Sequence, residues 1–362
     1  MAIKILSIDG GGIRGLIPAL ILTEIERRTG KKTSEMFDLL AGTSTGGIIA
    51  IGLNVNDPET GQPYAASRIA KLYESNGQQI FQKRHWVQAL GSLVDESFQH
   101  QGLEDILHAY FGEAELINSK TGLLITAYDI VRRKPFYFIS REAQLRPNHE
   151  NFRMRDIARA TSAAPTYFEP HLLSNGHYDQ LALVDGGVFA NNPAMLAYTE
   201  AINLKRWKDY QEAIDASQAR GISAEGVNTG DTARDFSAGL PQYLAPEHAP
   251  DFFMLSLGTG HTTHPYPYLE AKDWGLIGWA RPVVDILMQG VSESVDYQMQ
   301  YILPPTRDGK RHYYRLSPNI PESSSEMSDV SEANMHALKR IALAFIEEQD
   351  GVIQEICHAL NP

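Results

Sequence analysis

The sequence is poor in cysteine, because Cys357 is the single cysteine among 362 residues. One thiol excludes an intrachain disulfide framework, and it also excludes a metal site built from several cysteines. The chain contains no Asn-x-Ser/Thr glycosylation acceptor either. Neither absence points to a secreted protein.

Long apolar runs are also missing. The best apolar window, Gly46–Leu53, is less than half of the roughly 18 residues that a bilayer-spanning helix needs. The first apolar run, Ile3–Ile8, is too short for a signal peptide and ends in Asp9 and three glycines instead of a cleavage site. We therefore expect a cytoplasmic protein, for which transient or peripheral membrane contact is still allowed.

Positive charge is in deficit, since 32 Lys and Arg residues face 44 Asp and Glu residues, for a formal net charge of −12. Tight sequence-independent binding to nucleic acid depends on Lys and Arg that neutralise phosphates. An acidic protein also has no bulk attraction to an anionic membrane. We therefore expect no nucleic acid polymer as a partner, and the composition leaves the oligomeric state open.

What the sequence does contain is an alternation of short apolar segments and helical patterns. Six apolar segments are typical of buried strands: Ile3–Ile8, Phe37–Ala41, Leu123–Tyr128, Phe136–Ile139, Leu181–Val184 and Phe252–Leu257. Apolar residues at helical spacing predict helices that include Met154–Ala160, Pro193–Leu204 and Met335–Phe345. Strands that alternate with helices predict an α/β layer fold with a largely parallel sheet.

The simplest domain organisation is a single domain over residues 1–362, with a core formed by 3–204 and 251–350. Residues 205–250, approximately, differ in composition: they are rich in Ala, Ser, Gly, Asp and Gln and poor in large aliphatics. We expect a surface insertion there, helical at first and then a loop.

The strongest chemical motif is the G-x-S-x-G pentapeptide with Gly42, Ser44 and Gly46. Such a pentapeptide forms a sharp strand-to-helix turn that exposes the serine, and glycines two residues away leave room for the backbone. The apolar segments Phe37–Ala41 and Ile48–Leu53 supply the expected strand before the turn and helix after it. The pattern favours a nucleophilic Ser44 over a plain glycine-rich turn.

A second glycine-rich turn follows the first strand, where Asp9 precedes Gly10, Gly11, Gly12 and, after two more residues, Gly15. The G-x-G-x-x-G spacing suggests dinucleotide binding, but the acidic end of a second strand about 20 positions later is missing. The other use of backbone N–H groups at such a turn is an oxyanion hole, which a serine nucleophile needs.

A third motif, Asp185 followed by Gly186 and Gly187, comes directly after an apolar strand. A carboxylate at a strand end is exposed to a cleft, although an aspartate there also simply shapes a turn. A serine hydrolase usually needs a histidine base, and none of the twelve histidines stands in a pattern that selects it. On the residues alone, the partner of Ser44 stays open.

These motifs, in this order, resemble the patatin-like phospholipases. The resemblance runs along nearly the whole chain and is carried by five segments: Ile5–Pro18, Gly42–Gly47, Ala163–Phe168, Leu255–Gly260 and Met327–Met335. It implies a three-layer α/β/α sandwich with a mostly parallel central sheet. It also implies hydrolysis of acyl esters of phospholipids, lysophospholipids or galactolipids through an acyl-serine, without metal or cofactor.

The resemblance further implies a role for particular residues. Ser44 and Asp185 would form a catalytic dyad, which requires no histidine. The oxyanion hole would be formed by Gly10, Gly11 and Gly12. The residues that support these motifs would be Arg14, Gly15, Gly42, Gly46, Gly186 and Gly187.

Two alternative functions remain open for the chain. One is a regulated, membrane-degrading effector of the same fold, switched on by a ligand such as a cyclic nucleotide; the insertion at about 205–250, which departs from the family, would then gate the site. The other alternative is a dinucleotide-binding module, a hypothesis that rests only on Gly10–Gly15.

Gly187 is a further departure from the family pattern, because many relatives carry alanine there.

Overall fold

The computed structural model describes residues 2–80, 100–165, 167–219, 252–262 and 265–361. In this part of the chain the strands are β1 (Ile3–Ile8), β2 (Leu39–Thr43), β3 (Gly122–Asp129), β4 (Lys134–Ile139), β5 (His171–Leu173), β6 (Leu181–Asp185), β7 (Phe252–Leu257) and β8 (Tyr313–Leu316). They form one sheet in the order β5-β6-β3-β2-β1-β7-β8, and β4 pairs with β3 outside this path.

The helices in the described residues are α1 (Leu16–Thr29), α2 (Thr33–Met36), α3 (Thr45–Gly52), α4 (Ala66–Ile80), α5 (His100–Phe111), α6 (Ser140–Leu145), α7 (Pro147–Glu150), α8 (Met154–Thr161), α9 (Gly187–Ala190), α10 (Ala194–Ala219), α11 (Tyr268–Ala271), α12 (Leu276–Ile302), α13 (Glu332–Glu348) and α14 (Asp350–Leu360). The described residues include no helix that is both long and apolar enough to cross a membrane.

The sheet is parallel at its centre and antiparallel at one edge. Strands β8, β7, β1, β2 and β3 pair in parallel, whereas β4 and β6 pair antiparallel with β3 and β5 pairs antiparallel with β6. The predicted, mostly parallel sheet is therefore confirmed. The hairpin between β3 and β4 turns at Arg133, which has a φ of 52°.

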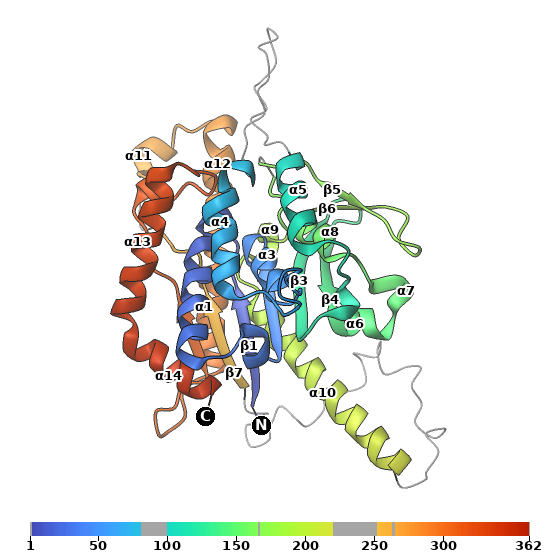
Figure 1. The fold of residues 1–362 in the computed structure, drawn as a ribbon. Helices are drawn as coiled ribbons and strands as arrows, with labels where there is room; N and C mark the ends of the chain where they lie inside the picture. Colours follow the sequence, from blue (N-terminus) through green and yellow to red (C-terminus); the bar gives the residue numbers. More distant parts are fainter. Residues whose placement is uncertain (1, 81–99, 166, 220–251, 263–264, 362) are drawn as a thin grey trace.

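Helices cover both faces of the sheet, and the alternation of side chains along β1 shows how. Leu6 and Ile8 pack into the larger core with α1, α3, α4, α13 and α14, while Ile3 and Ile5 pack into a second core with α10 and α12 (Figure 1). Successive side chains of a strand point to opposite faces, so a strand that is apolar at both sets of positions is buried on both. These three layers are the α/β/α sandwich that the family resemblance implies.

Several predicted boundaries move, most of them by three residues or fewer. The second strand begins at Leu39 instead of Phe37, because the Phe37 N–H donates to Thr33 O at 3.2 Å and closes α2. Helix α10 continues past the predicted end at Leu204 to Ala219, so the first part of residues 205–250 is helical as expected. Residues 220–251, which hold the rest of the predicted insertion, lie outside the described residues.

Candidate active site

Ser44 lies at a strained turn between β2 and α3. Its φ of 55° and ψ of −124° are rare for a residue with a side chain, and such strain costs about 1–3 kcal/mol. The Ser44 N–H donates to Thr161 Oγ1 at 2.8 Å and holds the turn. Because Ser44 directly precedes α3, the positive end of the helix dipole favours negative charge beside its hydroxyl.

The glycines of the pentapeptide are required by close backbone contacts. A β-carbon at Gly42 would overlap with the carbonyl oxygen of Gly46, and one at Gly46 would overlap with the carbonyl oxygen of Ile8. The turn therefore packs backbone against backbone between β1, β2 and α3. The contact between Gly42 and Gly46 is local in the sequence, whereas the contact of Gly46 with Ile8 depends on the pairing of β1 with β2.

Strand β3 brings Asp185 to Ser44, although the two residues are far apart in the sequence. Thr43, directly before Ser44, pairs with Thr126 of β3. Asp185, the last residue of β6, pairs with the next residue of β3, Ala127. The side chains of Ser44 and Asp185 line one apolar pocket of about 60 Å³, which we call the Ser44 pocket. Its other lining residues include Ile48, Ile80, Leu103 and Phe168.

The Asp185 carboxyl group is 2% exposed, and this burial raises its pKa from 3.8 to about 7. The Ser44 hydroxyl and the Gly187 N–H both oppose the shift, because they stabilise the carboxylate. Oδ1 accepts a hydrogen bond from the Gly187 N–H at 2.7 Å. Oδ2 is buried without a hydrogen-bond partner among the described residues. Oδ2 is thus available to accept a proton.

The glycine loop after β1 presents N–H groups beside the Ser44 pocket. The Gly10 N–H is already used, because it donates to Asn191 O at 3.1 Å. The N–H groups of Gly11 and Gly12 have no acceptor among the described residues, and Gly12 lines the Ser44 pocket. Gly12 has a φ of 58°, and a β-carbon there would overlap with Met327 O. Of the three predicted oxyanion-hole residues, Gly11 and Gly12 are those whose N–H groups are available.

The loop is held from both sides by residues to which the sequence analysis assigned no role. Arg315 of β8 forms a two-point ion pair with Asp9, with Nη1–Oδ1 and Nη2–Oδ2 distances of 2.9 and 2.5 Å. Burial lowers the pKa of the Arg315 guanidinium, but the Asp9 carboxylate outweighs burial and raises it. The Thr259 hydroxyl, after β7, donates to Gly10 O at 2.7 Å.

The remaining motif residues support this arrangement. Arg14 Nε donates to Gly11 O at 3.2 Å, so the side chain braces the loop that carries it. A β-carbon at Gly15 would overlap with Thr45 Oγ1, and one at Gly186 would overlap with Thr126 Oγ1. A β-carbon at Gly187 would lie 3.0 Å from Met288 Cε, 3.1 Å from Asp185 Oδ1 and 3.3 Å from Asn191 Oδ1, so an alanine there would require these side chains to shift slightly.

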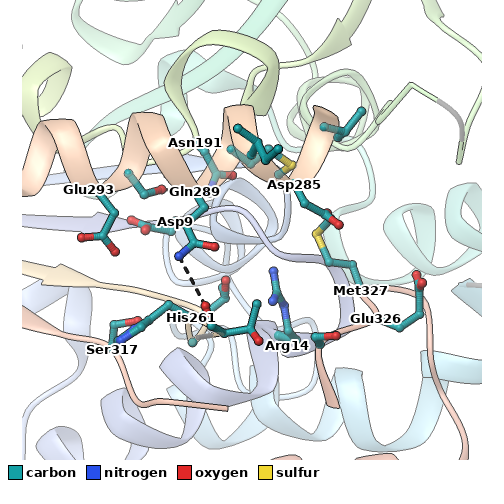
Figure 2. Close-up of a pocket in the computed structure, with 18 of the residues that line it drawn as sticks. Asp9, Arg14, Asn191, His261, Asp285, Gln289, Glu293, Ser317, Glu326 and Met327 are labelled. Atoms are coloured by element: carbon teal, nitrogen blue, oxygen red, sulfur yellow. Dashed lines mark hydrogen bonds between the residues drawn. The ribbon is translucent and has the colours of Figure 1, made fainter. Parts of the chain in front are cut away.

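A second, larger cavity adjoins the Ser44 pocket. It has a volume of about 360 Å³, most of the residues that line it are polar or charged, and we call it the polar cavity (Figure 2). The two share four lining residues: Tyr167, Val284, Met288 and Met327. An apolar pocket with the candidate nucleophile thus opens beside a polar one.

Asn191 links the glycine loop to the polar cavity, and sequence reasoning missed this role. Its backbone oxygen accepts from Gly10, and its Nδ2 donates to Ser292 Oγ of α12 at 3.0 Å. Oδ1 of the next residue, Asn192, accepts from the Ala194 N–H at 3.0 Å at the start of α10. The signal for Asn191 was present as the paired asparagines, but the partner on α12 is distant in the sequence.

Comparison with known proteins assigns a family to this site. The model of a family described as patatin-like phospholipase matches residues 6–198. Patatin-like protein 2 from Arabidopsis thaliana is 32% identical over 91% of this chain and 79% of its own length. Patatin-T5 from Solanum tuberosum is 30% identical over 94% of this chain and 82% of its own length. A crystal structure of VipD from Legionella pneumophila aligns with 95% of this chain and 67% of that chain at 10% identity, and its TM-score of 0.32 is too low to support an argument.

Proposed function

Because the chain belongs to the patatin-like phospholipase family, we propose that it is a lipid acyl hydrolase of the phospholipase A or lysophospholipase type. The observation that carries the proposal is the strained Ser44 in an apolar pocket, next to a buried carboxyl group with a pKa of about 7. A general base works best when its pKa lies near the working pH. Burial makes Asp185 a far stronger base than a solvated aspartate.

In the proposed reaction, Asp185 accepts the proton of the Ser44 hydroxyl while Oγ attacks the carbonyl carbon of the ester. The N–H groups of Gly11 and Gly12 stabilise the resulting oxyanion, and each such donor is worth about 3–4 kcal/mol in comparable sites. The intermediate collapses to acyl-Ser44, and the alcohol product leaves with the proton from Asp185. Asp185 then takes a proton from water, which attacks the acyl group. The fatty acid is released as the bond to Ser44 Oγ breaks, and Asp185 returns the proton to Oγ, which restores the Ser44 hydroxyl.

Ser44→Ala and Ser44→Gly are both expected to lower ester hydrolysis by about 10⁴-fold or more, because the nucleophile is gone. Ser44→Gly is expected to be about 1 kcal/mol more stable than Ser44→Ala, since glycine tolerates a φ of 55°. Hydrolysis of phosphatidylcholine and urea unfolding measure the two effects. Ser325, which has a φ of −79°, is the control position: there the alanine variant should be more stable than the glycine variant. Hydrolysis retained by Ser44→Ala would overturn the proposal.

The pH dependence of kcat/KM is expected to report Asp185. With a pKa of about 7, the carboxyl group is protonated in acid and cannot accept the Ser44 proton, so activity should fall about tenfold per pH unit below pH 7 and level off above it. Initial rates on phosphatidylcholine between pH 5 and 9 measure the profile. A profile that stays flat down to pH 5 contradicts a buried aspartate as the base.

The alternative functions gain no support from the described residues. The glycine loop faces the Ser44 pocket through Gly12 and packs on α3 through Gly15, and neither contact supports dinucleotide binding. The regulated effector stays an untested prediction, because most of the insertion that would gate the site lies outside the described residues.

A further inference from the structure

The polar cavity lies beside the Ser44 pocket, and the proposed reaction does not use it. Its volume of about 360 Å³ falls within the range of small-molecule sites, which begins near 300 Å³. A lipid with its ester carbonyl at Ser44 has an acyl chain on one side and a headgroup on the other. The shared wall of Tyr167, Val284, Met288 and Met327 therefore separates an apolar compartment from one that can take the headgroup.

One helix supplies both sides of this wall. Val284 and Met288 of α12 line both compartments. The residues of α12 that line the polar cavity alone include five polar ones at helical spacing: Asp285, Gln289, Ser292, Glu293 and Asp296. Figure 2 shows Asp285, Gln289 and Glu293 projecting from the helix on one side of the cavity, with Arg14 and His261 on the opposite side.

The charge of the cavity is strongly negative. Six carboxylates line it, against two guanidinium groups: Asp9, Asp285, Glu293, Asp296, Glu322 and Glu326, against Arg14 and Arg315. Arg315 is neutralised by its two-point ion pair with Asp9. The charge of Arg14 is opposed by Asp285 and Glu326, which face it from α12 and from the segment before α13 (Figure 2). An excess of carboxylate remains around Glu293 and Asp296.

The carboxylates are spread over the walls of the cavity. Among the described residues, no three acidic, histidine or cysteine side chains come close enough together to hold a metal ion. A dispersed arrangement of this kind suits a larger organic cation, such as an ammonium group. Asn191 Oδ1, 93% buried with its residue and without a hydrogen-bond partner in the described chain, adds a further acceptor to the same lining.

We propose that the polar cavity binds the substrate headgroup and selects phospholipids whose headgroup carries an ammonium group. The proposal rests on the proposed lipid acyl hydrolase function. An ammonium group gains favourable contacts with the carboxylates, while a headgroup with only a phosphate charge is repelled by them. Phosphatidylcholine is therefore a better substrate than phosphatidylglycerol with the same acyl chains.

The test measures kcat/KM for these two lipids, each present at a few mole per cent in micelles of a nonionic detergent, so that the surface charge of the micelles stays close to zero with either lipid. The expected preference of the wild-type protein for phosphatidylcholine is about tenfold. Asp285→Asn/Glu293→Gln, two exposed positions on α12, is expected to reduce the ratio to about threefold or less. Glu293→Gln alone should give a smaller reduction of this ratio. If the double variant is inactive, the single variant still tests the proposal.

The matched control is Glu347→Gln/Glu348→Gln, which removes the same charge from exposed positions of α13 and should leave the ratio at its wild-type value. A wild-type ratio near one, or an equal drop in the control variant, overturns headgroup selection. Failure of the proposed function gives a different result, because the wild-type protein would then hydrolyse neither lipid.

Discussion

Asp185→Asn is expected to abolish ester hydrolysis and to stabilise the protein at pH 8. The buried carboxyl group has a pKa of about 7 in the folded protein, compared with 3.8 when solvated. The folded state therefore binds this proton more tightly than the unfolded state does, so the stability that Asp185 contributes is complete below pH 4 and is lost as the pH rises through 7. Asparagine does not ionise and escapes this loss.

The shift of about three pKa units sets an upper limit of about 4 kcal/mol on the gain at pH 8. The advantage of Asp185→Asn should grow by roughly 2–3 kcal/mol between pH 5 and pH 8, as measured by urea unfolding at each pH. Asp273→Asn, where the side chain is 77% exposed, is the matched control for the loss of one aspartate. A pH-independent difference, or an active Asp185→Asn variant, would contradict the assignment of the base.

Arg315→Met is expected to destabilise the protein by about 3–5 kcal/mol. It leaves the Asp9 carboxylate, which is 2% exposed, without its two-point partner in the interior. Activity should fall as well, because Asp9 directly precedes the glycine loop. Thermal or urea unfolding measures the loss of stability. The kcat on phosphatidylcholine measures the loss of activity that displacement of the glycine loop should cause.

The double variant Asp9→Asn/Arg315→Met removes both charges and should recover much of the stability, since no unpaired buried charge remains. Arg311→Met is the matched control nearby, because its ion pair with Glu355 is exposed on both sides and is worth about 1 kcal/mol or less. If Arg315→Met were no more destabilising than Arg311→Met, the buried ion pair would not hold the loop.

Much of the fold was predictable because it depends on local patterns. The apolar segments at Ile3–Ile8 and Phe252–Leu257 are strands with these same bounds, since residues buried on both faces leave a continuous apolar run. Strand β8 was missed, because Tyr313–Leu316 is short and contains Arg315. The side chain of that arginine is only 17% exposed and pairs with Asp9, which lies far away in the sequence, so no local pattern reveals it.

The candidate site was predictable to a different degree for each residue. Ser44 could be predicted from the sequence because the glycines that its turn requires form a recognisable motif. Asp185 stood in a motif that, taken alone, favours a plain turn, and only the family resemblance paired it with Ser44. Gly10 shows the opposite case, because its N–H looked available in the sequence and is taken by Asn191 O.

The sequence by itself determined that the protein has one cysteine, no long apolar run and an excess of acid, and it also determined where a serine can sit at a strained turn. These properties depend on composition or on a few adjacent residues. Only the tertiary structure decided that β3 aligns Asp185 with Ser44, that burial moves the Asp185 pKa to about 7, and that α12 places carboxylates beside the site. Strand register, burial and the charge of a cavity arise from residues far apart in the chain, so they exist only once the layers have packed together.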